Sequence, residues 1–389
     1  MDEQQASPVL SALQAVSDPR KARGQRHGWG VIMAVMAAAL ASGQPNGRGI
    51  GPWVPEQADE LIARRRPARK RLPSPSTLRR ALRAVDLTAL EAEVAAFTMR
   101  WSAPEPTPAP IVTASGVGRE GLAVDGKAVR GVKRSGAALS LVRVGRHHRG
   151  IGLAHAAIPA GRREQATVPE LVATCDLCDT VVTLDAWHTH ASLAQQIRTQ
   201  QGHALMIVKA NQPTRYRDIA LLFDGPPWQS GDDADEVPTD RTFDTGHGRL
   251  ETRTLDASTA WRDSLDWPDV EPVLRRHCRR VIPKTGQISE ETTDAIRSVP
   301  RALAGASHFE VLGRAHGTIE NRDPSVRDVT CGEDSRRLRV GQAPHALATL
   351  RTAIISLCRA NDWRSIPDAL RHYGASVDRA LRLIGAPGL

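Results

Sequence analysis

The sequence has 389 residues and a mass of 42.1 kDa, longer than one ordinary core of roughly 100–200 residues, so two units or one heavily extended unit is expected. A hydrophobic content of 41% with 31 glycines and 26 prolines excludes a collagen-like or wholly disordered chain. The net charge of +9 favours a polyanionic partner, although an arginine-rich, lysine-poor chain can equally reflect the base composition of a genome.

Cysteine usage and hydropathy indicate a cytoplasmic protein. Five cysteines in a long chain is not the pattern of a disulfide-stapled secreted domain. The longest apolar run, residues 29–41, is shorter than the roughly 20 residues that span a bilayer, and no signal-peptide pattern precedes it. We therefore expect residues 29–41 to form a buried helix.

Residues 1–101 are expected to form a small, helical, basic domain that binds DNA. They contain 15 basic and 9 acidic side chains, and residues 102–118 after them are a linker rich in proline, alanine and serine. A helix is predicted from Ser76 to Ala84, with Ser76 as its N-cap. A charge run of this kind is also typical of a solvated surface. The cations expected to contact DNA are Arg64, Arg65, Arg66, Arg69, Lys70, Arg71, Arg79, Arg80 and Arg83.

After the linker, the periodicity changes from helical to strand-like. Three strands are predicted first, and then helices alternate with fully apolar strands. The order β-β-β-α-β-α-β predicts a ribonuclease-H-like mixed sheet flanked by helices. The expected strands are residues 121–129, 138–144, 151–158, 180–184 and 204–208, and the expected helices are residues 167–175 and 191–200.

The second half of the chain predicts a strand-rich insertion before a last catalytic helix. Strands are expected at residues 249–255, 273–283 and 293–299, within an insertion of about residues 213–305. Helical spacing returns at residues 317–329 and 345–359. The expected catalytic domain covers residues 119–360, and a helical tail covers residues 361–389.

Two aspartates stand where a phosphodiester-cutting site would need them. Asp125 interrupts the first strand and Asp185 ends the fourth, and these strands are neighbours in the expected sheet. Adjacent buried carboxylates repel unless a cation bridges them, and oxygen donors on a rigid sheet suit Mg²⁺. Glu320 is the best candidate for a third ligand from a later helix. An Asp or Glu taken alone is more commonly an N-cap, turn or surface residue, and Asp185 could simply cap the next helix.

The chain resembles the ISAs-type, H-repeat-associated insertion-sequence transposases, which carry a DDE catalytic triad on a ribonuclease-H-like domain. The resemblance runs from about residue 8 to residue 360. Several motifs in the same order are more specific than any one of them. The motifs are SDPRKARGQRH (17–27), LAVDGKAVRG (122–131), VVTLDAWHTH (181–190), MIVKANQP (206–213), HGRLETR (247–253), RAHGTIEN (314–321) and GEDSRRLR (332–339).

The resemblance implies metal-dependent cleavage and strand transfer at the ends of an insertion sequence. Asp125, Asp185 and Glu320 would be the catalytic residues and would bind Mg²⁺, with Mn²⁺ as a substitute. The expected partners are double-stranded DNA, as element terminal repeats and as target, and a second copy of the chain in a homodimer. When bound to DNA, the protein would be associated with the bacterial nucleoid. The further residues expected near DNA are Lys127, Arg130, Lys209, Asn211, Gln212, Arg249, Arg314, His316, Asn321 and Arg327.

The segment around Glu320 departs from the family pattern. Gly317 stands where the family has a tryptophan, and Pro324 is expected to shorten or bend the helix that carries the third acid. Two other functions stay open: a catalytically inactive, transposase-derived DNA-binding protein, and a stand-alone ribonuclease-H-like nuclease. Beside Asp185, Trp187 is expected to pack or to stack on a displaced base, and His188 is expected at the surface.

Overall fold

The computed structural model describes residues 9–386 except 45, 66, 68–69, 102–119, 135–136, 148, 160, 225–239, 247, 259–264, 266, 272, 301–305 and 333–340. Two compact units are present. Unit 1 consists of Met1–Glu105, Gly126–Thr167 and Glu320–Leu389, and unit 2 of Pro106–Asp125 and Val168–Ile319. Among the described residues, no helix is long and apolar enough to cross a membrane.

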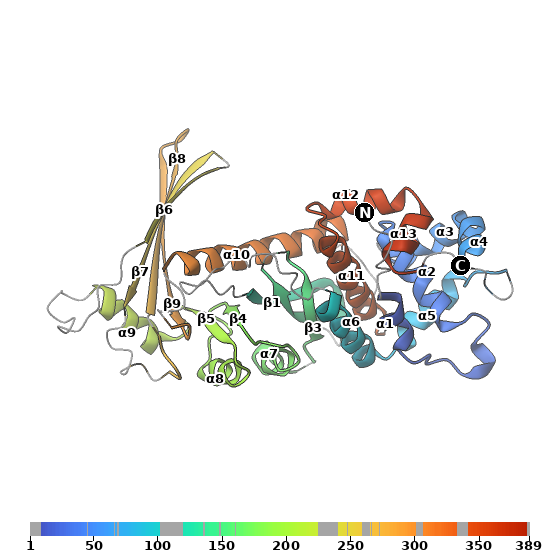
Figure 1. The fold of residues 1–389 in the computed structure, drawn as a ribbon, viewed down its shortest axis with the longest axis horizontal. Helices are drawn as coiled ribbons and strands as arrows, with labels where there is room; N and C mark the ends of the chain where they lie inside the picture. Colours follow the sequence, from blue (N-terminus) through green and yellow to red (C-terminus); the bar gives the residue numbers. More distant parts are fainter. Residues whose placement is uncertain are drawn as a thin grey trace. The chain divides into compact units, whose positions relative to one another are not determined.

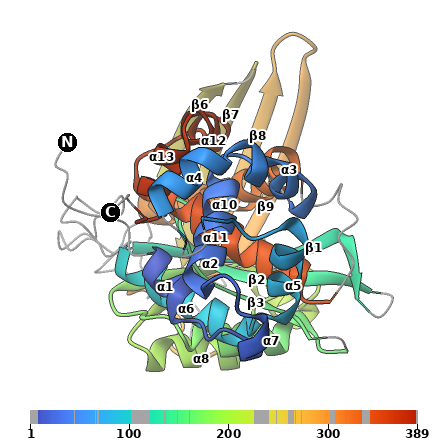
Figure 2. The same ribbon diagram turned by 90° about the vertical axis from the view of Figure 1, so that its right-hand side faces the viewer.

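Unit 1 has a helical core that the two ends of the chain build together (Figures 1 and 2). The apolar α2 is its centre, with eleven buried residues, and α1, α11 and α13 pack against it. The amide of Leu10 also donates to the carbonyl of Ile384 at 3.0 Å. The helices are α1 Val9–Ala15, α2 Trp29–Ala41, α3 Gly47–Glu56, α4 Ala58–Arg65, α5 Pro75–Ala84, α6 Leu87–Trp101, α11 Ala343–Ala360, α12 Ile366–Gly374 and α13 Val377–Leu383, with a short 3₁₀ turn at Ala22–Gly24.

The basic helix α5 begins one residue earlier than its sequence predicts. Ser74, not Ser76, is the N-cap, and its hydroxyl accepts from the amide of Thr77 at 3.3 Å. Pro75 is the first helical residue. An amide hydrogen at this position has no partner within the helix, so proline loses no hydrogen bond there. Leu78 and Leu82 are buried as expected.

The central sheet has the strand order of a ribonuclease-H-like fold. The order β3-β2-β1-β4-β5 places β1 beside β4, and both β1–β4 and β4–β5 are parallel pairs, while β2 and β3 are antiparallel. All five residues of β4 are buried, as its apolar sequence predicts. The fold class expected from the sequence is confirmed. The elements are β1 Glu120–Arg134, β2 Ala137–Arg146, β3 Gly152–Ala157, α7 Glu164–Val172, β4 Thr180–Leu184, α8 Ala191–Thr199 and β5 His203–Val208.

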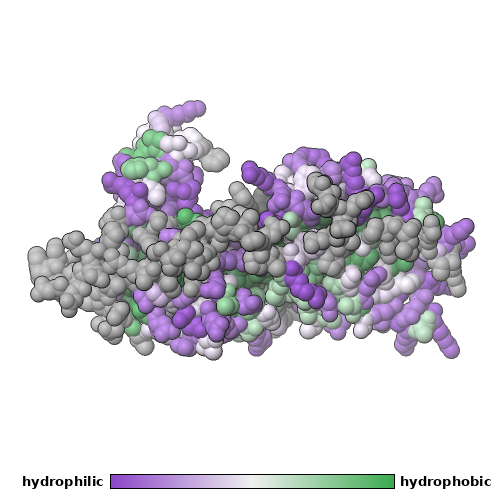
Figure 3. Space-filling model, in the orientation of Figure 1, coloured by the Kyte–Doolittle hydropathy of each residue, from purple (hydrophilic) through white to green (hydrophobic). Residues whose placement is uncertain are grey.

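The strand-rich insertion extends the same sheet beyond β5. Four antiparallel strands continue it in the order β9-β8-β7-β6, with β9 paired to β5. Figure 3 shows hydrophobic surface among the polar residues of these strands, where Phe243, Leu250 and Ile288 are exposed. The elements are α9 Pro213–Asp224, β6 Asp240–Gly246, β7 Arg249–Ser258, β8 Val273–Ile282 and β9 Gln287–Arg297.

The helix that follows the insertion, α10, runs from Ala306 to Ser325 without a break. The expected shortening at Pro324 is therefore wrong, but the helix changes to a π-helical turn, Val326–Thr330, directly after it. Proline has no amide hydrogen to donate to the carbonyl four residues earlier, which accounts for a change of hydrogen-bonding pattern at this point. At the other end of α10, the guanidinium of Arg297 stacks over Phe309, 4.0 Å from the ring centre.

Candidate active site

Asp125 and Asp185 occupy matching positions on neighbouring parallel strands of unit 2. The register pairs Ala123 of β1 with Thr183 of β4, and each aspartate follows two residues later. Because side chains alternate between the two faces of a sheet, both acids belong to the face that carries Ala123 and Thr183. Neighbouring strands are about 4.8 Å apart, so the structure brings these two positions together.

Asp185 organises the turn that follows β4. Its Oδ1 accepts from the backbone amides of Trp187 at 3.0 Å and His188 at 3.1 Å, an Asx turn. The N-cap position of α8 is His190, so Asp185 does not cap that helix. The carboxylate is 56% exposed. It is thus held by two amide hydrogen bonds and is still open to solvent.

Polar residues after β5 hold the same turn from the other side. The side-chain amide of Asn211 donates to the carbonyl of Ala186 at 2.8 Å, and that of Gln212 donates to the carbonyl of Thr189 at 2.5 Å. Lys209, just before them, is exposed. Asn211 and Gln212 therefore position the turn after Asp185, and the charge of Lys209 acts on Glu291 of β9.

A hydrogen bond ties α10 to β4, the strand directly before Asp185. Thr183 Oγ1 lies 2.8 Å from His316 Nδ1 and 3.1 Å from the carbonyl oxygen of Leu122. A hydroxyl has one hydrogen, and the carbonyl can only accept it, so Thr183 accepts from a protonated His316 Nδ1. The helix α10 therefore lies over the face of the sheet on which Asp125 and Asp185 stand.

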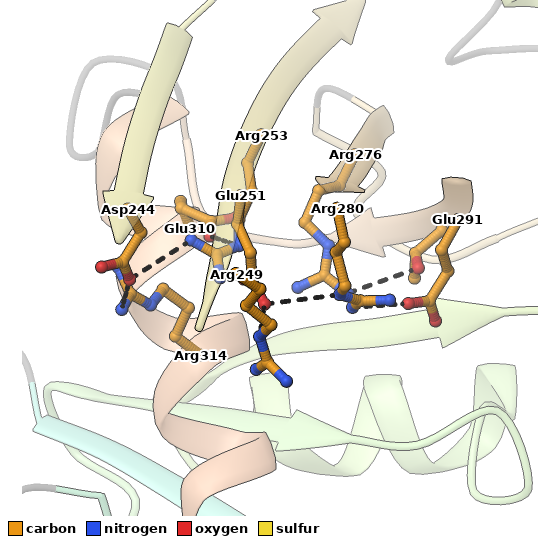
Figure 4. Close-up of polar contacts among 10 residues, drawn as sticks. Asp244, Arg249, Glu251, Arg253, Arg276, Arg280, Glu291, Glu310 and Arg314 are labelled. Carbon is orange, nitrogen blue, oxygen red and sulfur yellow. Dashed lines mark hydrogen bonds and ion pairs between the residues drawn. The ribbon is translucent and has the colours of Figure 1, made fainter. Parts of the chain in front are cut away.

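An ion-pair network joins the other half of α10 to the insertion strands (Figure 4). Arg253 of β7 pairs with Glu251, with Asp244 at 3.6 Å and with Glu310 of α10 at 3.4 Å. Arg314, one helical turn after Glu310, pairs with Asp244 at 2.6 Å. These ion pairs connect α10 to β6 and β7 through their charged side chains.

The electrostatic balance at Glu310 is set by burial. Its side chain is 5% exposed, and burial raises the pKa of the carboxyl group, while the cations Arg276, Arg253 and Arg314 oppose that rise. Arg249, expected near DNA, is half-exposed and pairs with Glu251 at 2.5 Å. Arg314 is also half-exposed. Each of these two arginines is therefore paired with an acid and is still exposed to solvent.

The cations of the N-terminal helices lie largely on the surface. Arg79, Arg80 and Arg83 are exposed on α5, opposite its buried leucines. Lys70 and Arg71 are exposed before it. Arg64 on α4 pairs with Asp378 of α13 at 3.3 Å and is 43% exposed.

The structure does not support one expected DNA contact. Arg327 is 5% exposed and donates to the hydroxyl of Thr352 at 2.7 Å. A guanidinium enclosed in this way holds the protein's own chain and is not on a surface that DNA can reach. For the other expected residues that follow, either the side chain or the whole residue lies outside the described part of the chain: Arg65, Arg66, Arg69, Lys127, Arg130, Glu320 and Asn321.

Some features beside the acids were not expected from the sequence. Trp187 is 54% exposed, so it does not pack as a core residue, whereas His188 is buried and not at the surface. In unit 1, a Cβ on Gly126 would lie 1.7 Å from Glu164 Oε1, which shows that the carboxylate of Glu164 lies against this glycine. Only the three-dimensional structure reveals that approach.

Two families of known sequences match the chain. Residues 10–98 match "DDE_Tnp_1-associated" and residues 118–357 match "Transposase DDE domain". "Putative transposase YncI" of Escherichia coli O157:H7 is 26% identical over 246 residues, which span 61% of this chain and 61% of that protein. "Uncharacterized protein in dhlA 3'region" of Xanthobacter autotrophicus is 24% identical over 287 residues, 72% of this chain and 90% of that protein.

Among solved structures, the piggyBac transposase synaptic complex with hairpin DNA aligns with a TM-score of 0.45 and 11% identity, over 95% of this chain and 77% of that one. The fold assignment does not depend on this alignment, because the strand order gives it directly. The family match covers more than half of the sequence. The chain belongs to the transposase DDE domain family.

Proposed function

We propose that the chain is a DDE transposase that cuts DNA at the ends of an insertion sequence and joins the freed ends to target DNA. The observation that carries this proposal is the pairing of Asp125 and Asp185 on one face of the sheet, beneath a helix tied to Thr183. For the third acid we propose Glu320, which belongs to the motif RAHGTIEN and whose side chain lies outside the described part of the chain. The proposed triad is therefore Asp125, Asp185 and Glu320.

The donor set of this proposed site fits Mg²⁺ or Mn²⁺. Asp125 and Asp185 supply carboxylate oxygens from adjacent strands, and the amide bonds to Asp185 fix the orientation of its group. Two divalent ions at such a site supply charge stabilisation for in-line attack at a phosphodiester. The three acids would hold the ions, and Asn211 and Gln212 would keep the turn after Asp185 in place.

The proposed DNA contacts come from both units. The exposed arginines of α5 would contact phosphates, and Trp187 is exposed enough to stack on a displaced base beside Asp185. Lys209, Arg249 and Arg314 would add cations near the cut. Arg327 is left out of this set because it is buried. Since two element ends must be handled together, we also propose that a homodimer is the active form.

The test uses the full chain with labelled DNA that carries the inverted repeats flanking its gene, in Mg²⁺ or Mn²⁺. We expect cleavage at the repeat ends, joining to target DNA, and loss of both by at least about 100-fold in Asp185→Asn. Asp179→Asn is the matched control, because Asp179 is an exposed aspartate just before the opposite end of β4. Mass photometry on end DNA measures whether two copies assemble.

Other results would separate the competing functions. Binding to the repeats without cleavage in either metal would indicate an inactive DNA-binding descendant. Nicking of DNA that lacks the repeats, without joining, would indicate a stand-alone nuclease. Equal activity of Asp185→Asn and the wild type would overturn the assignment of the triad.

A further inference from the structure

A second group of metal-ligating side chains lies in unit 1 and shares no residue with the three acids proposed for catalysis. Glu91 of α6, His155 of β3 and His345 of α11 place one donor atom each within 4.8 Å of one another. His345 Nε2 lies 2.6 Å from Glu91 Oε1, and His155 Nε2 lies 3.7 Å from the same oxygen. Two imidazoles and one carboxylate form a donor set that Zn²⁺ and similar dications use.

The geometry is close to that of a metal centre. Donor atoms bound to one tetrahedral zinc ion lie roughly 3.4 Å apart, and the observed separations of 2.6 and 3.7 Å fall on either side of this value. Thr349, one turn after His345 on α11, places its hydroxyl 3.0 Å from His155 Nε2. A fourth coordination position beside Thr349 could thus be filled by this hydroxyl or by a solvent molecule.

The surroundings are those of a buried site. His155 and His345 are 6% and 5% exposed, and the side chain of Glu91 is 20% exposed. Within the described part of the chain, Nδ1 of His345 has no hydrogen-bond partner. Two buried imidazoles beside one carboxylate therefore form a polar cluster inside unit 1.

Neighbouring charges set how strongly a cation can bind. Arg327 and Arg143 lie close enough to His155 to act on it electrostatically. The same arginines repel a dication, and Glu91 is the one carboxylate among the three ligands. We therefore expect weaker binding than at an all-thiolate structural zinc site.

We propose that Glu91, His155 and His345 bind a divalent transition metal of the zinc class, which ties α6 to β3 and α11. The ion would act as a structural link inside unit 1, where the helices of the N-terminal family match meet elements of the DDE domain match. None of its three residues is among the acids proposed for catalysis.

The test titrates Co²⁺ into the chelator-treated full chain and records visible absorption, which is strong for Co²⁺ in a tetrahedral site. We expect a Co²⁺ band that Zn²⁺ abolishes and a rise in Tm on addition of Zn²⁺. His345→Gln and Glu91→Gln should each weaken Co²⁺ binding at least about 100-fold. His203→Gln is the control, because His203 is an equally buried histidine outside the cluster.

Asp185→Asn separates this site from the proposed catalytic one. If the proposal is right, Asp185→Asn keeps the Co²⁺ band whatever its effect on DNA cleavage. A band that survives in His345→Gln, or a wild-type chain with neither a Co²⁺ band nor a Zn²⁺-dependent rise in Tm, would overturn the metal site. Should His345→Gln fail to fold, Glu91→Gln and the wild-type Tm still decide the question.

Discussion

Replacing Thr183 with valine should slow DNA cleavage more than it weakens the fold. The substitution keeps the shape of the side chain but removes the hydroxyl that joins His316 to the carbonyl of Leu122. Thr183 is 3% exposed, so water cannot replace the lost partner. With a net contribution of about 0.5–1.5 kcal/mol for each hydrogen bond, the free energy of unfolding should fall by about 1–3 kcal/mol.

The larger effect should be on the rate, because the lost bond positions α10 over the paired aspartates. A displacement of about 1 Å in a catalytic group can reduce the rate about 100-fold, so a 10- to 100-fold loss in single-turnover cleavage is expected for Thr183→Val. The affinity for end DNA should stay within about threefold of the wild type, because Thr183 is buried. Urea unfolding and cleavage at saturating protein measure the two quantities independently.

Thr183→Ser provides the control that separates positioning from stability. Serine keeps the hydroxyl and loses a buried methyl group, which costs about 1 kcal/mol. We expect Thr183→Ser to lose stability but to cleave at nearly the wild-type rate. If Thr183→Val cleaves as fast as Thr183→Ser, the bond to His316 does not position the helix and the reasoning fails.

The other predictions concern charge and packing. Burial raises the pKa of Glu310, so the free energy of unfolding of the wild type should fall as the pH rises above about 4.5, the pKa of this group in the unfolded chain. In urea unfolding, Glu310→Gln should match the stability of the wild type at pH 4 and exceed it at pH 7. The opposite order would mean that the arginines outweigh burial. Gly126→Ala should lower the free energy of unfolding by about 1 kcal/mol, because the new Cβ displaces Glu164, and adding Glu164→Ala should restore part of that loss. If the losses of the two single variants simply add in the double variant, the contact is contradicted. Arg79→Gln should reduce the slope of log binding constant against log salt concentration for DNA by about one unit. Arg371→Gln should not change this slope, because Arg371 is an exposed arginine on α12 that pairs with an acid. Equal slopes for the two variants would mean that α5 is not part of the DNA interface.

The sequence predicted best those elements whose residue pattern is compatible with one type of secondary structure. Residues 29–41 are nearly all apolar and form α2 with the expected bounds, and the apolar run at residues 180–184 forms β4. Strand β6 was missed, because DRTFDTG contains one large apolar residue and its pairing with β7 supplies the strand geometry. The N-cap of α5 was assigned to Ser76 because a serine after proline reads as a cap, whereas Pro75 itself starts the helix.

The candidate active site likewise contains features that the sequence predicts and features that it does not. The neighbouring positions of Asp125 and Asp185 follow from strand order, which the sequence carries. The contact between Thr183 and His316 joins residues 133 positions apart and depends on how α10 packs, which no local pattern encodes. Arg327 was taken as a DNA contact because sequence cannot distinguish a buried guanidinium from an exposed one. The role of Glu320 stays a prediction.

The shared helical core of unit 1 constrains how the protein is made. Helices α1 to α6 bury their apolar faces together with those of α11 to α13, so they lack a complete core while the ribosome is still translating the middle of the message. At about 5–20 residues per second, the delay is on the order of ten seconds to a minute. A nascent chain interrupted before α11 would therefore emerge without a folded amino-terminal half, and incomplete translation products would lack the folded helices of unit 1.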